Sequence, residues 1–214
     1  MKVLTLTILI LVATTQVVAQ KETCVTDRNA PPVNAYYWPP DTAVKVYFVR
    51  GMFTAEQRTT LLAAMKSWSD GSANAGAGIS FSYTGESDGL LRCESCLTVT
   101  RKEVHKKDRK HYAFFNPMKQ NQDGLLVSAW IDFDFATTSP QALQGFMAHE
   151  LGHGMGLLDC ANCRKKKTIM NRFPAINKDN GLVAPSDCDL EVVRKVYQLQ
   201  RQVGNNTVAK KGEQ

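Results

Sequence analysis

The sequence predicts an α+β protein that combines one run of strands with three helices. Five segments show the period-two alternation or the β-branched and aromatic content of strands. Three segments show helical spacing of apolar residues or a capping signal at their start. With 214 residues, of which 43% are apolar, the chain is long enough to form one well-buried domain.

The first half of the chain contains one predicted helix between strands. Residues 44–49 alternate as a strand. Thr54 and Gln57 have the spacing of a capping box, which predicts a helix from there to about Ser69. The apolar side chains expected on its buried side are Leu61, Leu62, Met65 and Trp68. Further strands are expected at 79–83, 97–104 and 112–115.

The second half contains one more strand and two helices. Residues 121–124 (Asn-Gln-Asp-Gly) mark a turn, and a strand is expected from Leu125 to Phe133. The Ser139-Pro140 pair suits the start of a helix, with proline at its first position. Residues 171–185 are expected to be irregular. The last helix is capped by Ser186 and Asp189 and is expected to run to about Val203.

Both ends of the chain are expected to lie outside this domain, which spans 44–203. Residues 1–19 have the short apolar run and the final small residues of a secretory signal peptide cleaved after Ala19. An uncleaved membrane anchor is the alternative, but the apolar run is short for a membrane span. Residues 20–43 are rich in proline and fit an extended N-terminal arm, and residues 204–214 fit a flexible tail. We therefore expect a secreted protein, extracellular or periplasmic, with no membrane segment after cleavage.

Six cysteines follow the predicted cleavage site, and an even number in an exported chain favours up to three disulfides. The simplest pairing joins each close pair locally and ties the two remaining cysteines together, although fifteen connectivities are possible. The pairs are Cys93 with Cys96, Cys160 with Cys163, and Cys24 with Cys188. The two Cys-x-x-Cys pairs could instead form a closed structural zinc site, which an oxidising compartment disfavours.

The stretch that begins His149-Glu150 and continues to His153 has the spacing of a metal site on a helix. Two histidines four residues apart lie about 40° apart around a helix and roughly 6 Å apart along it, so both rings can reach one ion. Gly156 can end the helix in a left-handed turn, which brings Asp159 back toward the same ion. Two imidazoles, a carboxylate and an open fourth position are typical of a catalytic zinc site. Glu150 is placed to act on water as a general base rather than to bind the metal.

This stretch, together with Met170 in Thr-Ile-Met-Asn, resembles the signature of the metzincin zinc peptidases, and most closely their matrixin-like branch. The resemblance is specific over residues 140–171 and topological over the rest of 44–203. The usual third ligand of the family is histidine, and Asp159 in its place is similar to snapalysin-like members. The resemblance implies a zincin domain with a twisted mixed five-stranded sheet, an active-site helix, a Met-turn and a C-terminal helix. It also implies a zinc-dependent metalloendopeptidase.

Other residues could serve as ligands or occupy the site. His105 and His111 flank a lysine-rich turn and fit solvated loop residues better than ligands. Glu191 lies on the last predicted helix, where thermolysin-like enzymes place their third ligand, but those enzymes lack the turn that follows the second histidine here. Cys24 could block the zinc as a matrixin propeptide thiol does, although its neighbours do not match that motif.

The expected partner is a protein or peptide substrate bound as an extended strand. The resemblance implies that residues 111–115 form an exposed antiparallel edge strand, which can pair with substrate main chain. The chain carries a formal net charge of +6 with basic runs at 106–110 and 164–167, which fit solvated loops. No aromatic or groove-reading element accompanies them, so we expect no nucleic-acid partner, and we expect a monomer. The alternative function is an exported, non-catalytic zinc-binding or adhesion module with the same fold, against which Glu150 argues because a metal site alone does not need it.

Overall fold

The computed structural model describes residues 24, 30–33, 36–103, 113–164, 167–171 and 182–211, with side chains described up to residue 202 in the last helix. The predicted signal peptide (1–19), His105 and His111 lie outside the described residues. So do residues 172–181, in the segment expected to be irregular.

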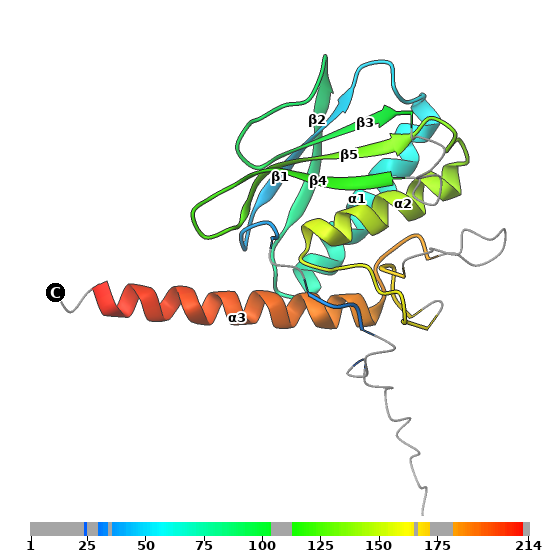
Figure 1. Ribbon diagram of the computed structural model, residues 1–214. Helices are drawn as coiled ribbons and strands as arrows, with labels where there is room; N and C mark the ends of the chain where they lie inside the picture. Colours follow the sequence, from blue (N-terminus) through cyan, green and yellow to red (C-terminus); the bar gives the residue numbers. More distant parts are fainter. Residues whose placement is uncertain are drawn as a thin grey trace, which may run out of the picture.

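Five strands form one mixed sheet in the order β2-β1-β3-β5-β4 (Figure 1). They are β1 (Ala43–Val49), β2 (Ser80–Ser87), β3 (Cys96–Lys102), β4 (Ala113–Gln120) and β5 (Leu126–Asp134). The first four strands in that order run parallel, and β4 at the edge is antiparallel to β5. This confirms the predicted α+β fold with a mixed five-stranded sheet.

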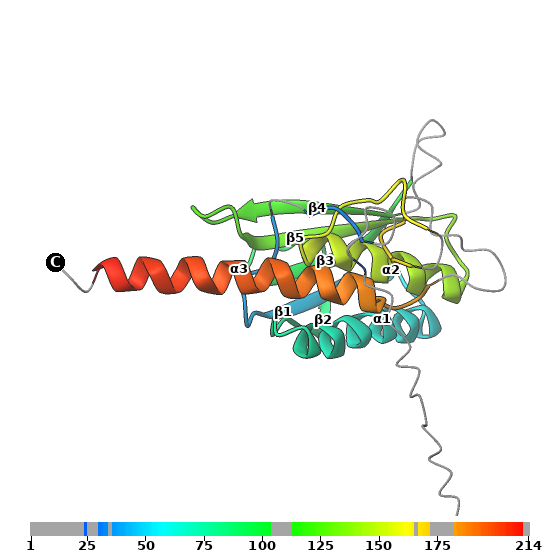
Figure 2. The ribbon, with the colours of Figure 1, turned by 90° about the horizontal axis from the view of Figure 1, so that it is seen from below.

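Two helices, α1 (Ala55–Asn74) and α2 (Pro140–Gly154), pack against each other, with α1 also against β2 and α2 against β4. The third helix, α3 (Asp187–Lys211), lies beneath them and extends past the sheet toward the C-terminus (Figures 1 and 2). The core between sheet and helices includes Val46 and Phe48 of β1 and Trp68 of α1, none of them more than 1% exposed. In the described part of the chain, no helix is both long enough and apolar enough to cross a membrane.

The capping box at the start of α1 is confirmed. The Thr54 hydroxyl accepts a hydrogen bond from the Gln57 N–H, and the Thr54 N–H donates to the Gln57 side chain at 3.1 Å. The helix ends at Asn74, beyond the predicted end at Ser69, although Gly71 and Ser72 are poor helix formers. Tertiary contacts explain the extension, since the buried Ser72 hydroxyl accepts from the Ile79 N–H at 2.7 Å just before β2.

The edge strand β4 runs to Gln120, beyond the end predicted at Phe115. Pro117 lies within it and shifts the register between Pro117 and Lys119. Proline is tolerated there because one side of an edge strand carries no partner strand. The last helix is also longer than predicted and ends at Lys211 instead of Val203, because Gly204 and the asparagines after it do not stop a helix that is already formed.

All three predicted disulfides are present: Cys24–Cys188, Cys93–Cys96 and Cys160–Cys163. The alternatives for these cysteines are therefore excluded. The two Cys-x-x-Cys pairs do not form a structural zinc site, and Cys24 is not a free thiol that could block a metal.

Candidate metal centre

Helix α2 carries both histidines of the motif. Its start is fixed by Ser139, whose hydroxyl accepts from the Ala142 N–H at 3.5 Å, and by Pro140 at the first turn. Four apolar side chains along it are buried: Leu143, Phe146, Met147 and Leu151. The rings of His149 and His153 follow on the same part of the helix, with centroids 5.0 Å apart and planes at 86°.

The chain turns back toward these rings immediately after α2. Gly156 has φ +89°, and the Leu157 N–H donates to the Gly152 carbonyl while the Gly156 N–H donates to the His153 carbonyl, both at 3.1 Å. This pair of bonds is a Schellman motif, which needs a left-handed residue at the position of Gly156. The predicted turn is therefore present, and the chain leaving it carries Asp159.

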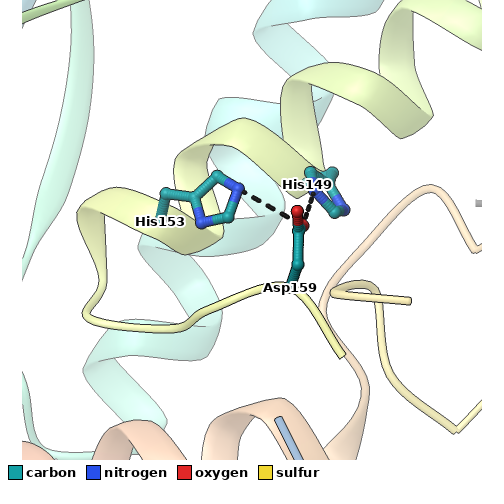
Figure 3. A group of neighbouring side chains, drawn as sticks. All are labelled: His149, His153 and Asp159. Carbon is teal, nitrogen blue, oxygen red and sulfur yellow. Dashed lines mark hydrogen bonds and ion pairs between the residues drawn. The ribbon is translucent and has the colours of Figure 1, made fainter. Parts of the chain in front are cut away.

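The Asp159 carboxylate lies close to both histidine rings, as Figure 3 shows. Its Oδ1 lies 2.9 Å from Nε2 of His149 and 3.6 Å from Nε2 of His153. One ligand atom from each of the three residues lies within 4.8 Å of the others. In the described part of the chain this is the one such group of three or more His, Cys, Asp or Glu side chains.

The backbone holds each ring so that its Nε2 faces the carboxylate. Nδ1 of His149 lies 2.9 Å from the Ile169 carbonyl, and Nδ1 of His153 lies 2.9 Å from the Leu157 carbonyl. A carbonyl only accepts, so each Nδ1 carries a hydrogen and each Nε2 is the nitrogen left to face a ligand. Nε2 of His149 also donates a hydrogen to Asp159 in the absence of a metal, and it would have to lose that proton when a metal binds. Metal-binding histidines are usually fixed in this way, and two imidazole nitrogens with one carboxylate oxygen fit zinc.

The site carries negative charge that a cation can balance. Burial lowers the pKa of His149, but the hydrogen bond to Asp159 and the charges of Glu150 and Asp159 outweigh it and raise that pKa to about 9. Glu150 is 5% exposed, and its Oε2 lies 3.9 Å from Nε2 of His153. Its carboxylate therefore lies beside His153, and its charge acts on His149, without belonging to the group of three.

Met170 lies directly against α2, as expected for a Met-turn. It is fully buried, and a Cβ at Gly152 would lie only 2.3 Å from its Sδ. The Met170 carbonyl accepts from the Cys160 N–H at 2.7 Å, so the turn is also joined to the residue after Asp159. The thioether thus packs beside the helix one residue before His153.

Asp189 is a buried acid whose contact with the residues around His149 is not predicted by the sequence. It was identified only as a helix cap, yet its carboxylate also accepts from the Thr168 hydroxyl and, at 2.9 Å, from the Ile169 N–H. Burial raises the pKa of Asp189, and these hydrogen bonds, with those from Ser186, oppose that shift. Because the Ile169 carbonyl also accepts from His149, α3 is linked to the group of His149, His153 and Asp159 through one residue. No local pattern could have indicated this contact, since it joins segments about twenty residues apart.

The other candidate ligand does not take part. Glu191 forms an ion pair with Lys195 at 3.0 Å on α3 and is absent from the cluster. His105 and His111 lie outside the described residues. Among the candidates that the structure describes, only Asp159 joins the two motif histidines.

Comparisons with known proteins give distant structural similarity only. No protein-family model and no curated protein sequence matches the chain. The solved structures similar to it include metalloproteinase-II from Bacteroides fragilis, with a TM-score of 0.46, 9% identity, and coverage of 79% of this chain and 58% of that one. Two myroilysin structures have TM-scores of 0.33 and 0.41 at 17% and 13% identity. They cover 57% and 80% of this chain and 44% and 94% of their own chains. Similarity at this level assigns neither a family nor an activity.

Proposed function

We propose that this chain is a secreted, zinc-dependent metalloendopeptidase of the metzincin type, matrixin-like, with an aspartate ligand as in snapalysin-like members. His149, His153 and Asp159 would hold the zinc, and Glu150 would act as general base. The observation that carries this proposal is the convergence of the three side chains, with both Nε2 atoms facing one carboxylate oxygen.

Zinc, when bound, would lower the pKa of water and polarise the carbonyl of a peptide bond. The chain itself supplies the proton transfer. Glu150 follows a ligand on α2 and lies beside His153, so its carboxylate can take the proton from the attacking water and deliver it to the leaving amine.

The edge of the sheet offers a place for the substrate. β4 is antiparallel to β5 and ends the sheet, and the Phe115 ring centroid on β4 lies 6.4 Å from that of His153. An extended peptide that added to this edge would therefore run alongside the histidine pair. Pairing through main-chain hydrogen bonds would allow a broad range of sequences. We propose a protein or peptide substrate in this position and a monomeric enzyme.

Secretion is supported by the predicted signal peptide and by the three disulfides, which persist in oxidising compartments. An aspartate ligand also adds negative charge to the site that a neutral histidine would not. This charge suits a divalent cation, and we expect it to move the working pH range upward.

Metal content and cleavage of an unstructured protein substrate test the proposal together. The purified, oxidised chain should bind one zinc ion and cleave the substrate, and a chelator should abolish cleavage. Glu150→Gln should keep the zinc and lose at least about 100-fold in kcat, the usual contribution of general-base catalysis. Asp159→Asn should lose zinc affinity.

The same experiment separates the alternative function. A non-catalytic zinc-binding module would bind zinc but cleave nothing, and Glu150→Gln would behave as the wild type in every measurement. Normal cleavage by Glu150→Gln would disprove the assigned role of that residue.

A further inference from the structure

The described part of the N-terminal arm runs antiparallel to the segment that leads from α2 to Asp159. The Trp38 N–H donates to the Gly154 carbonyl at 3.1 Å, and the Tyr37 ring lies against Gly156, where a Cβ would be 3.2 Å away. Further along, Val33 forms an antiparallel bridge with Leu157, and the Leu158 N–H donates to the Pro32 carbonyl at 2.9 Å. Successive arm residues thus meet successive turn residues in reverse order. We call residues 32–33 and 36–38 the strap.

The strap is itself held by the rest of the fold. The Tyr37 carbonyl accepts from the Leu126 N–H at 2.9 Å, and the Trp38 carbonyl accepts from the Tyr197 hydroxyl at 3.0 Å. Trp38 is fully buried. At its other end the arm is tied to α3 by the Cys24–Cys188 disulfide. The strap is therefore fixed at Tyr37 and Trp38, and the chain that precedes it is joined to α3.

Asp159 depends on such contacts because no helix or sheet of the domain carries it. The residues before it, Leu157 and Leu158, bond to the strap, and the residue after it, Cys160, donates to the Met170 carbonyl. A metal ligand on a loop must be ordered when the ion binds, and the entropy lost in that step weakens affinity unless the loop is ordered beforehand.

We propose that the strap is a positioning element for Asp159, so that the metal centre includes residues that precede the catalytic domain in sequence. The proposal rests on the proposed function only in taking Asp159 as a metal ligand. Partners that orient metal ligands typically contribute 10-fold to 100-fold to affinity. Release of the strap should weaken zinc binding by about that factor.

The test is a comparison of two double-serine variants by zinc competition with a chromophoric chelator. Cys24→Ser/Cys188→Ser removes the disulfide that joins the arm to α3, and Cys93→Ser/Cys96→Ser removes a disulfide at the start of β3, away from the strap. We expect the zinc Kd to rise about 10-fold to 100-fold in the first variant and little in the second. The visible spectrum of the cobalt-substituted protein should change only in the first variant, since it reports the ligand set.

A milder variant and a double-mutant cycle separate an effect on the position of Asp159 from an effect on the stability of the whole fold. Pro32→Gly keeps the carbonyl acceptor and both cysteines but loosens the arm, and should raise the Kd about 2-fold to 5-fold. In an Asp159→Asn background, release of the strap should have no further effect on the Kd.

The possible outcomes are distinct. Unchanged zinc affinity in Cys24→Ser/Cys188→Ser, or an equal loss with and without Asp159, would overturn the strap proposal and leave the proposed function intact. Zinc binding without peptidase activity would overturn the proposed function. The strap proposal would then still stand or fall on the zinc Kd of the variants. A wild-type chain that binds no zinc would overturn both.

Discussion

Gly152 is the position at which one added methyl group tests the packing of the metal centre. An alanine there would bring its Cβ to 2.3 Å from Met170 Sδ and to 3.3 Å from a ring carbon of Trp68. Ordinary carbon contacts are about 3.5–4.0 Å, so the sulfur would have to move by more than about 1 Å. Trp68 cannot yield easily, because it is fully buried and its Nε1 donates to the Ala148 carbonyl at 2.6 Å. The Met170 side chain must therefore move.

The expected effect combines two terms of opposite sign. Forcing one methyl into a packed core costs about 1–3 kcal/mol, and replacing glycine by alanine inside a helix contributes up to about 1 kcal/mol in the other direction. We expect Gly152→Ala to lower the free energy of unfolding by about 1–2 kcal/mol. Displacement of Met170 should also disturb Ile169, which orients His149, and raise the zinc Kd.

Urea unfolding of the metal-free, oxidised protein measures the first effect. Gly145→Ala is the matched control, because Gly145 lies on the same helix and its Cβ would meet only the Leu182 carbonyl, at 3.3 Å. The control should be close to neutral. In the double variant Gly152→Ala/Met170→Ala the clash is removed, so its stability should not fall below that of Met170→Ala alone. A Gly152→Ala protein as stable as the wild type would refute the packing described for Met170.

Three further predictions concern charged groups. Asp189→Asn should lower the free energy of unfolding by about 1–3 kcal/mol, because an amide has one acceptor oxygen for donors that the carboxylate satisfies with two. Asp187→Asn, at an exposed position, is the control, and its free energy of unfolding should stay within about 0.5 kcal/mol of the wild type. Asp159→His should move the acidic limb of the pH–rate profile down by about one pH unit, because it removes a negative charge, and an unchanged limb would contradict this. In metal-free protein, the raised pKa of His149 adds stability that is complete below pH 6.5 and is lost as the pH rises through about 9. Urea unfolding with a chelator from pH 6 to 10 tests this, and stability that does not decline toward the alkaline end would disagree.

The features that sequence could predict are those with local causes. The capping box of Thr54 and Gln57, the helix start at Ser139 and the left-handed turn at Gly156 depend on residues a few positions apart, and all three are present. The disulfides were predictable because two pairs are close in sequence and leave Cys24 and Cys188 as the remaining pair.

The features that sequence missed have causes outside the element concerned. The extension of α1 to Asn74 depends on the Ser72 hydroxyl bonding to Ile79 just before β2, and Pro117 persists in β4 only because that strand is at the edge. The contact of Asp189 with Thr168 and Ile169 joins a helix cap to a distant turn. Periodicity and capping signals carry no information about these contacts, so they could not find them.

The three glycines of the motif region show that the site is specified by packing as well as by its ligands. Each of Gly152, Gly154 and Gly156 leaves room for a different side chain from a distant part of the chain: Met170, Trp38 and Tyr37. At Gly154 a Cβ would be 2.9 Å from Nε1 of Trp38, and at Gly156 it would meet the Tyr37 ring in a left-handed backbone. Two of these neighbours belong to the strap. A chain that kept both histidines and Glu150 but carried larger residues at these positions would separate the helix from the segments that hold Asp159 in place. The spacing of small residues is therefore as much a part of the proposed metal centre as the spacing of its proposed ligands.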